Sequence, residues 1–245
     1  MRYTCRVVLF LFTCLFGFSG HLVAGEYDGI GHVELKKMID QDLREFVLVD
    51  ARNPEEYKEA HIPGAINIPE KEFSRFTGLL PSNKNSMLIF YCNGVKCGKS
   101  NKSAKKALEL GYAKILVYAE GMPVWEEMGY SFYKGTGYEK RIETTKLSPQ
   151  ELNILMKTGN ENIQVVDVRD KEEFTEGHIP GSVNLPLGEF ALGSDMLDKK
   201  KSIIVYCNSG GRSYGAYRKL MRLGYKNIYQ AIFADWKEQG LPVSL

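Results

Sequence analysis

The residues of this chain with the clearest chemical potential lie at 207–213 and read C-N-S-G-G-R-S. The two glycines allow a tight turn in which successive backbone N–H groups point inward and form a nest for an anion. A helix that begins here adds the positive end of its dipole, and Arg212 adds a planar cation. In such surroundings Cys207 should ionise below the usual thiol pKa of about 8.5 and act as a nucleophile at neutral pH.

A thiolate next to an anion-binding nest suits two kinds of reaction. It can attack the sulfur of thiosulfate or a similar donor, or the phosphorus of a phosphate ester, while the nest holds the oxyanion. The alternative is a buried cysteine that only packs at the end of a strand. Because glycines, an arginine and a helix start coincide around Cys207, we favour a reactive thiol.

A second candidate loop lies at 91–100 and reads Y-C-N-G-V-K-C-G-K-S. Its context between a strand and a helix and its ending G-K-S are typical of a nucleotide-binding P-loop. Such a loop needs four residues between its first glycine and G-K-S, whereas three residues separate Gly94 from Gly98. The spacing excludes a P-loop and leaves two thiols, Cys92 and Cys97, as the chemical groups of this segment.

Both loops belong to an internal repeat. Residues 47–69 match residues 164–186 without a gap, and the match resumes near the cysteines, where Cys92 corresponds to Cys207. A repeat of this length is a whole domain, because the units of solenoid proteins run only to about 50 residues. The identical positions include Asp50 and Asp167, Arg52 and Arg169, His61 and His178, Asn67 and Asn184, and Trp125 and Trp236.

The elements that position the cysteines alternate between strands and helices. In the second copy, Ser148 caps a helix and the buried strand I-Q-V-V-D-V follows. A short helix, two more strands, a helix over 214–223 and a last strand at K-N-I-Y-Q complete the copy. This order predicts an α/β fold in which each of two tandem domains has a mostly parallel central sheet flanked by helices. Each cysteine ends a strand, where such sheets bind their ligands.

Three motifs together resemble the rhodanese (sulfurtransferase) family in a tandem, exported form. They are D-x-R…E-E-F/Y…G-H-I-P-G-S-x-N, the loop C-x-x-G-x-R-S and the terminal D-W-x-x-x-G-L-P. The resemblance implies an enzyme without a cofactor. It would move sulfane sulfur from thiosulfate or a similar donor, through a cysteine persulfide, to a thiophilic acceptor such as cyanide or a thiol. The implied partners are small sulfur-containing anions and a thiol protein as acceptor.

On this resemblance, Cys207 is the nucleophile and Arg212 binds the sulfonate of the donor. The family commonly has two glycines before its final helix, where this chain has A-I-F at 231–233, so the wall of the pocket differs. The implied substrate-binding residues are Asn208, Ser209, Gly210, Gly211, Arg212 and Ser213.

The first loop departs from this pattern. Cys92 and Ser100 are eight positions apart, whereas their counterparts are six apart, and Lys99 replaces the arginine. Three interpretations stay open. In the first, the loop is a second sulfurtransferase site with Cys92 as catalytic residue and Lys96 and Lys99 as its cations. In the second, it is a thiol–disulfide site in which Cys97 resolves a persulfide or pairs with Cys92. In the third, it is a degenerate site. Phosphatase chemistry is disfavoured, because lysine lacks the planar fork of arginine. For the whole protein, the alternative is a sulfur or redox carrier without turnover.

The N-terminus predicts export, with the bacterial periplasm as destination. Arg2 and Arg6 precede an apolar run too short to span a bilayer, and small residues follow, as in a cleavable signal peptide. An uncleaved anchor is the alternative. Cleavage after residue 24 would lower the formal charge from +2 to zero, which argues against a nucleic-acid partner. It would leave no membrane segment and three cysteines, an odd number that favours a free thiol.

The predicted organisation is a signal peptide (1–24), a first domain with the longer loop (25–134), a linker (135–145) and a second domain (146–245). No ligand spacing typical of a zinc site occurs. Several polar and aromatic residues are assigned structural roles. Asp50–Arg52 and Asp167–Arg169 are expected as internal ion pairs, His61 and His178 as turn residues, Trp125 and Trp236 as packing anchors, and Lys199–Lys201 as a solvated turn.

Overall fold

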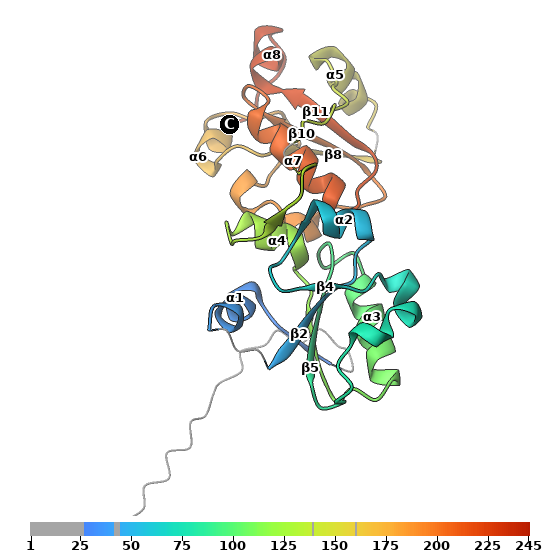
Figure 1. The fold of residues 1–245 in the computed structure, drawn as a ribbon. Helices are drawn as coiled ribbons and strands as arrows, with labels where there is room; N and C mark the ends of the chain where they lie inside the picture. The colour runs from blue at the N-terminus through green and yellow to red at the C-terminus, as the bar shows by residue number, and fades with distance from the viewer. Residues whose placement is uncertain (1–26, 42–44, 139, 160) are drawn as a thin grey trace, which may run out of the picture.

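The structure is a computed structural model that describes residues 27–41, 45–138, 140–159 and 161–245. The predicted signal peptide, residues 1–24, lies outside the described residues. Figure 1 shows two α/β units, the first coloured blue to green and the second yellow to red. None of the helices formed by the described residues has the length and hydrophobicity needed to cross a membrane.

Five parallel strands form the sheet of the first copy, in the order β1-β6-β5-β2-β4. The central strand β5 ends directly before Cys92. A separate antiparallel pair joins β3 to β7. The strands are β1 (Asp28–Gly29), β2 (Phe46–Asp50), β3 (Ala60–His61), β4 (Ile66–Asn67), β5 (Met87–Tyr91), β6 (Lys114–Tyr118) and β7 (Tyr133–Lys134).

Four parallel strands form the sheet of the second copy, in the order β11-β10-β8-β9. The strands are β8 (Ile163–Asp167), β9 (Val183–Asn184), β10 (Ser202–Cys207) and β11 (Ile228–Ile232). Cys207 is the last residue of β10, which lies between two neighbours and is fully buried over its last five residues. The predicted α/β fold with mostly parallel sheets is confirmed, and in both copies the cysteine lies at the carboxyl end of the equivalent strand, as the last residue of β10 or directly after β5.

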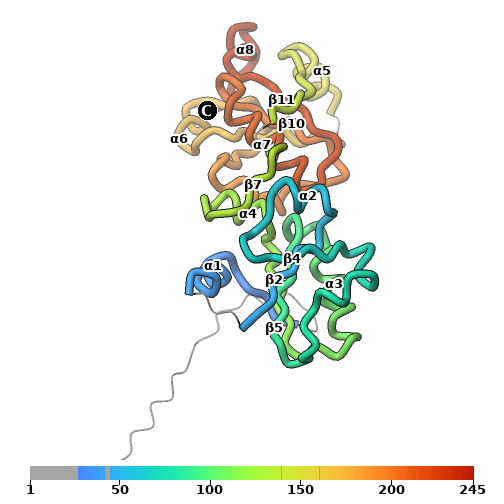
Figure 2. Tube along the Cα trace, in the orientation of Figure 1, coloured from blue at the N-terminus to red at the C-terminus, as the bar shows by residue number. Residues whose placement is uncertain are grey.

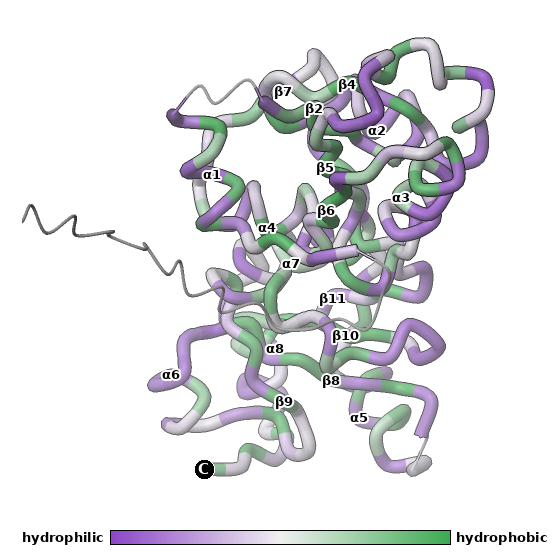
Figure 3. Tube along the Cα trace, turned by 90° about the horizontal axis from the view of Figure 1, so that it is seen from below, coloured by the Kyte–Doolittle hydropathy of each residue, from purple (hydrophilic) through white to green (hydrophobic). Residues whose placement is uncertain are grey.

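Helices cover both faces of the sheets. Along β2, successive residues enter different cores, since Leu48 packs with Trp125 on one face and Val49 packs with Ala104 on the other. Figure 3 shows the contrast between hydrophobic β2 and hydrophilic α6.

The helices are α1 (His32–Asp40), α2 (Pro54–Glu59), α3 (Lys99–Glu109), α4 (Gly121–Glu127), α5 (Pro149–Lys157), α6 (Lys171–Glu176), α7 (Gly211–Arg222) and α8 (Phe233–Glu238), with short 3₁₀ segments η1 (Glu70–Arg75), η2 (Thr77–Leu79), η3 (Leu187–Glu189) and η4 (Leu192–Met196).

The helix starts follow from local capping. Ser148 and Glu151 form the predicted capping box of α5, with Pro149 in the first turn. Helix α7 begins at Gly211 and not at the predicted residue 214. The reason is Gly210, whose left-handed backbone (φ 100°) turns the chain from the loop directly into the helix.

The segment predicted as a linker, 135–145, is attached to both copies. The N–H of Gly135 donates to the Glu59 carbonyl at 2.9 Å, and the carbonyl of Thr145 accepts the N–H of Gln230 at 2.8 Å. The N–H of Leu147 then donates to the Gln230 carbonyl at 2.9 Å. The end of the segment therefore runs along the edge strand β11 of the second sheet.

Helices α4 and α2 of the first copy lie next to the second unit (Figure 2), and charged side chains join the two copies there. The buried carboxylate of Glu127 accepts the N–H groups of Ala191 and Leu192 at 2.9 and 3.1 Å and pairs with Lys219. Arg222 pairs with Glu126 through an Nη1–Oε1 contact of 2.6 Å. The C-terminal half of α7 is thus fixed to the first copy, while its N-terminus carries the Cys207 loop.

Candidate active site

Cys207 lies at the carboxyl end of β10, 1% exposed, with its sulfur directed into the turn that follows. The N–H groups of Gly210 and Ser213 donate to this sulfur at N–S distances of 3.1 and 3.3 Å. The hydroxyl oxygen of Ser213 lies 3.5 Å from it. The predicted nest of backbone donors is therefore present around Cys207.

These donors change the acidity of the thiol. Burial alone raises the pKa of Cys207, because it removes water from the charged form. The Ser213 hydroxyl and the N–H groups of Ser213, Gly210 and Ser209 act against burial, and their net effect holds the pKa below the usual value of a cysteine. A thiolate that keeps its charge through backbone donors is a nucleophile at neutral pH.

The remaining predicted loop residues have other contacts. The carbonyl of Asn208 accepts the N–H of Ala234 at 3.1 Å, which ties the loop to α8. Gly211 is the first residue of α7. At Gly210, a Cβ atom would lie 3.1 Å from Ile232 Cδ1, so both the left-handed backbone and the available space favour glycine there.

Arg212 is held by two carboxylates at the start of α6. Its Nη2 lies 2.8 Å from Glu173 Oε1, and its Nη1 lies 3.3 Å from Asp170 Oδ2. The Arg212 hydrogen bond holds the pKa of Glu173 below its usual range, although burial opposes this. The hydrogen bond to Glu173 raises the pKa of Arg212, burial opposes this, and the charges of Glu173, Asp170 and, least, Cys207 add to the rise. That Arg212 binds the donor's sulfonate stays a prediction.

Gln230 is a residue of this site that sequence reasoning missed. Its side chain is buried on β11, and its Nε2 donates at 2.8 Å both to the Gly210 carbonyl and to Ser213 Oγ. Its Oε1 accepts the hydroxyl of Thr144 at 2.8 Å. Because Ser213 Oγ accepts a hydrogen bond from Gln230, its own proton is left to point at Gly210 O or at the sulfur. The available signal was a glutamine within the otherwise apolar strand I-Y-Q-A-I.

An open groove of about 910 Å³ lies beside the Cys207 loop. One side is formed by the loop backbone from Ser209 to Gly211, and the other by the segment from Arg141 to Lys146. Arg218 adds a further cation to its lining. Glu143 also lines the groove, whereas Cys207 does not, so the groove adjoins the backbone of the loop that holds the sulfur.

The first loop holds its thiols differently. Cys92 is fully buried, whereas Cys97 is partly exposed, and both are free thiols, as Cys207 is. The hydrogen bond between the Cys92 and Cys97 side chains raises the pKa of Cys92, and burial raises it further. The same hydrogen bond, helped by the N–H groups of Lys99 and Asn93, lowers the pKa of Cys97 to about 6, although burial opposes this. In this loop the stabilised thiolate is that of Cys97.

The predicted cations of the first loop are engaged with protein groups. Lys99 Nζ lies 3.2 Å from Glu56 Oε2, which corresponds to the contact between Arg212 and Glu173 in the second copy. Lys96 donates to the carbonyl of Leu197 in the second copy. The side chains of Lys96 and Lys99 therefore support the loop, and their part in substrate binding stays a prediction.

Lys199–Lys201 were predicted to form a solvated turn; Lys199 and Lys200 lie in a turn and Lys200 is exposed, but the prediction is wrong for the side chain of Lys199, which is packed against protein groups. Its ammonium group donates to the Leu223 carbonyl and lies 5.2 Å from the centre of the Tyr225 ring. Burial lowers the pKa of Lys199, and the charge of Cys97 opposes this effect. The turn folds back onto the end of α7, which brings Lys199 towards the loop of the first copy.

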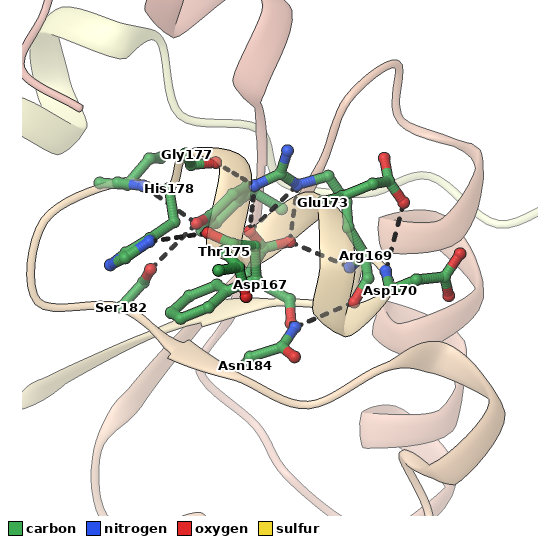
Figure 4. A network of polar contacts seen from close by, with 12 residues as sticks. Asp167, Arg169, Asp170, Glu173, Thr175, Gly177, His178, Ser182 and Asn184 are labelled. Carbon is green, nitrogen blue, oxygen red and sulfur yellow. Dashed lines mark hydrogen bonds and ion pairs between the residues drawn. The ribbon is translucent and has the colours of Figure 1, made fainter. Parts of the chain in front are cut away.

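The predicted internal ion pairs are confirmed. Arg169 Nε lies 3.0 Å from both carboxylate oxygens of Asp167, and its Nη2 donates to the Gly177 carbonyl at 2.7 Å (Figure 4). Arg52 and Asp50 form the same buried pair in the first copy. His178 stacks on Phe174 with ring centres 3.8 Å apart. The histidine has a structural contact, as predicted.

The tryptophans also have the predicted packing role, since Trp125 and Trp236 are 1% and 2% exposed in the cores of the two copies. Within the part of the chain that the structure describes, no group of three or more histidine, cysteine or acidic side chains is placed to hold a metal ion.

Comparison with known proteins identifies similar chains. The family described as "Rhodanese-like domain" matches residues 32–128 and 148–238. A protein of Bacillus subtilis (strain 168) named as a sulfur carrier, YrkF, is 35% identical over 79 residues, which are 31% of this chain and 43% of that protein. A sulfurtransferase of Allochromatium vinosum is 35% identical over 86 residues, 34% of this chain and 79% of that protein. A thiosulfate:glutathione sulfurtransferase of Saccharomyces cerevisiae is 31% identical over 107 residues, 39% of this chain and 76% of that protein. Each match has about the length of one copy of the repeat.

Proposed function

This chain belongs to the rhodanese-like family, in a tandem form with two matching segments, and we propose that it moves sulfane sulfur from thiosulfate or a similar anion to a thiophilic acceptor through a persulfide on Cys207. The prediction of a rhodanese-type transferase is confirmed by the family match and by relatives that are named sulfurtransferases. The identity of the donor, the identity of the acceptor and the persulfide intermediate on Cys207 are what we propose beyond the transferase class.

The observation that carries the proposal is the set of donors on Cys207 Sγ. Two backbone N–H groups, from Gly210 and Ser213, lie 3.1 and 3.3 Å from the sulfur and favour its ionised form. The thiolate attacks the outer sulfur of thiosulfate, the S–S bond of the donor breaks, and sulfite leaves with the electron pair. The nest then holds the negative charge on the outer sulfur of the persulfide.

The acceptor completes the cycle. Cyanide or a thiolate attacks the outer sulfur, the S–S bond of the persulfide breaks, and Cys207 leaves as the thiolate. The groove beside the loop has three cations in its lining, Arg141, Lys146 and Arg218, against one carboxylate, Glu143, and this excess of positive charge suits an anionic thiol as acceptor. The Saccharomyces relative, whose name gives glutathione with thiosulfate, supports a thiol in this role. Arg212 contributes its charge from its anchored position at Glu173.

Export remains part of the proposal. The predicted signal peptide (1–24) and the predicted domain limits, 25–134 and 146–245, describe a periplasmic enzyme released after cleavage. N-terminal sequencing of the protein from the periplasmic fraction of a bacterial host tests this. Recovery of the full-length chain in the membrane fraction contradicts it.

The test of the activity is thiosulfate with cyanide, with thiocyanate as the measured product. The proposal predicts continuous thiocyanate release, the mass of one additional sulfur atom on the peptide that contains Cys207, and loss of both in Cys207→Ser. A single stoichiometric burst of thiocyanate instead identifies the alternative, a carrier without turnover. Unchanged turnover in Cys207→Ser moves the chemistry away from this residue.

A further inference from the structure

The segment that joins the two copies, residues 141–147, is held against both helix α7 and strand β11 of the second copy. The N–H of Ile142 donates to the Tyr214 hydroxyl at 3.0 Å, which fixes the start of the segment to the first turn of α7. The hydroxyl of Thr144 donates to Gln230 Oε1 at 2.8 Å, which fixes its middle to β11. The segment therefore has a defined position beside the second loop, although it lies between the two stretches that match the rhodanese-like family.

This segment forms one wall of the groove beside the loop. Arg141, Glu143 and Lys146 line the groove from the segment, and Arg218 lines it from α7. The guanidinium of Arg141 lies 5.8 Å from the centre of the Tyr214 ring, which limits the positions that its charge can take. A volume of about 910 Å³ is typical of a site for a small molecule. Three cations against one carboxylate suit a small ligand with more than one negative charge.

The cations of the groove are not neutralised by the carboxylates that the structure describes. Arg218 donates to the Tyr138 carbonyl at 2.7 Å and has no ion pair with a described carboxylate, and the same holds for Arg141 and Lys146. The other cations of α7 do have such pairs, and these are Arg212, Lys219 and Arg222. The charges that line the groove are thus available to a ligand.

We propose that this groove binds the sulfur acceptor, and that the segment 141–146 makes it specific for a small thiol that carries two carboxylates. This role rests on the proposed function, because the sulfur that the acceptor takes is the outer sulfur of a persulfide on Cys207. Gly210 lines the groove, and its N–H donates to Cys207 Sγ at 3.1 Å. A thiol whose body lies in the groove is therefore one loop residue away from the sulfur, and the persulfide extends one bond beyond it.

The transfer conserves atoms and electrons. The thiolate R–S⁻ of the acceptor attacks the outer sulfur of the Cys207 persulfide, and a new S–S bond forms. The bond between the outer sulfur and Cys207 Sγ breaks, and Cys207 leaves with the electron pair as a thiolate. The proton of the acceptor thiol ends on the outer sulfur, so the product is the persulfide R–S–SH. The cations of the groove bind the carboxylates and take no part in these bond changes, so they act mainly on the KM of the acceptor.

The test measures sulfite release from thiosulfate with two acceptors, mercaptosuccinate, which carries two carboxylates, and 2-mercaptoethanol, which carries none. In the double variant Arg141→Met/Lys146→Met, kcat/KM for mercaptosuccinate should fall about fivefold to tenfold more than kcat/KM for 2-mercaptoethanol, because each exposed charge pair contributes a few-fold. Most of the loss should be in KM. Comparing the same two thiols in each protein cancels the difference in their nucleophilicity. Lys157→Met, at an exposed position outside the groove, is the control and should leave the ratio unchanged.

A binding measurement gives a second readout that does not depend on turnover. S-methylglutathione carries two carboxylates but has no thiol, so it cannot accept sulfur. Calorimetry with the Cys207→Ser protein should show that it binds, and the addition of Arg141→Met and Lys146→Met should weaken this binding about fivefold to tenfold. Binding should also weaken as the salt concentration rises, since exposed charges are screened.

The outcomes separate this role of the groove from the proposed function. An unchanged ratio in the double variant, or equal losses for the two thiols, overturns the specificity of the segment. Thiocyanate release with cyanide but no sulfite release with mercaptosuccinate also overturns it, and leaves the proposed function intact. No turnover with any acceptor overturns the proposed function and the acceptor role together, and charge-dependent binding of S-methylglutathione would then show a site for dicarboxylates without sulfur transfer.

Discussion

The two cysteine loops follow equivalent strands and precede equivalent helices, but their backbones stabilise sulfurs at different positions. In the second copy the N–H groups of Gly210 and Ser213 surround Cys207 at the strand end. In the first copy the hydrogen bond with Cys92, helped by the N–H groups of Lys99 and Asn93, lowers the pKa of Cys97, five positions after the strand-end cysteine, while Ser100 Oγ lies 3.3 Å from the sulfur of Cys92. The longer loop thus raises the pKa of its strand-end cysteine and lowers that of its second cysteine, whereas the shorter loop lowers the pKa of the strand-end cysteine itself.

The contacts that hold the cation of each loop are more similar between the two copies than the loops themselves are. The glutamate at the third helical position of α6, Glu173, caps that helix and also binds Arg212. Glu56 has the same two roles in α2, where it binds Lys99. In each copy the capping box therefore fixes the cation of the loop. The difference between the loops lies in the path of the backbone.

Removal of the strand-end sulfur is expected to have the largest effect. Cys207→Ser should lower thiocyanate turnover by about a thousandfold or more, because the nucleophile is lost. Cys92→Ser should leave turnover within about twofold, since Cys92 is not the stabilised thiolate of its loop. Steady-state assays with thiosulfate and cyanide measure both. Similar losses in the two variants would show that the loops are equivalent after all.

A side chain at the turn of the second loop is expected to have the next largest effect. Gly210→Ala places a Cβ 3.1 Å from Ile232 Cδ1 on a left-handed backbone. It should lower the free energy of unfolding by about 1–3 kcal/mol and displace the donors from the sulfur. Turnover should fall more than about tenfold, because the thiolate loses its donors.

Gly181→Ala is the matched control for this prediction. Gly181 also has a positive φ of 75°, but no atom lies within 4 Å of its added Cβ. Urea unfolding should show a comparable loss of stability, while thiocyanate turnover stays near that of the unmodified chain. Equal losses of turnover in the two variants would mean that stability, and not the position of the donors, limits the reaction.

The sequence predicted the shared features of the two copies better than their differences. The repeat, the strand-end cysteines and the Asp–Arg pairs follow from residue types at fixed spacing, because they depend on local structure. Lys199 and Gln230 could not be assigned in this way. The first lies next to a loop of the other copy, and the second joins the loop to Thr144 through contacts distant in the sequence. Such contacts depend on how the elements pack.

Substitution of Gln230 tests the support behind Cys207. The parallel register places Val117 of the first copy at the position of Gln230, so Gln230→Val gives the second copy the residue of the first. Loss of the hydrogen bonds to Ser213 and Gly210 should raise the pKa of Cys207, because the Ser213 hydroxyl is no longer oriented.

Iodoacetamide labelling of Cys207 against pH measures this change. Labelling requires the thiolate, so it is lost as pH falls through the pKa, and Gln230→Val should shift the loss to higher pH. At neutral pH the rate should fall roughly threefold to tenfold. Thr144→Val removes only the outer hydrogen bond to Gln230 and should have a smaller effect. An unchanged pH profile in Gln230→Val would assign Gln230 to packing alone.

Removal of one cation next to the first loop is the smallest predicted effect. In the Cys207→Ser protein, labelling of Cys97 should rise as pH passes through about 6, since the thiolate exists above its pKa. Lys199→Met removes a positive charge within electrostatic reach of this thiolate and should move that midpoint upward, slowing labelling near pH 6 by about twofold to fivefold. Lys200→Met, at an exposed neighbouring position, is the control and should leave the midpoint unchanged. If the labelling midpoint is the same in both variants, the second copy covers the first loop without affecting the charge of Cys97. If only Lys199→Met shifts the midpoint, the Cys97 thiolate depends on a residue of the other copy.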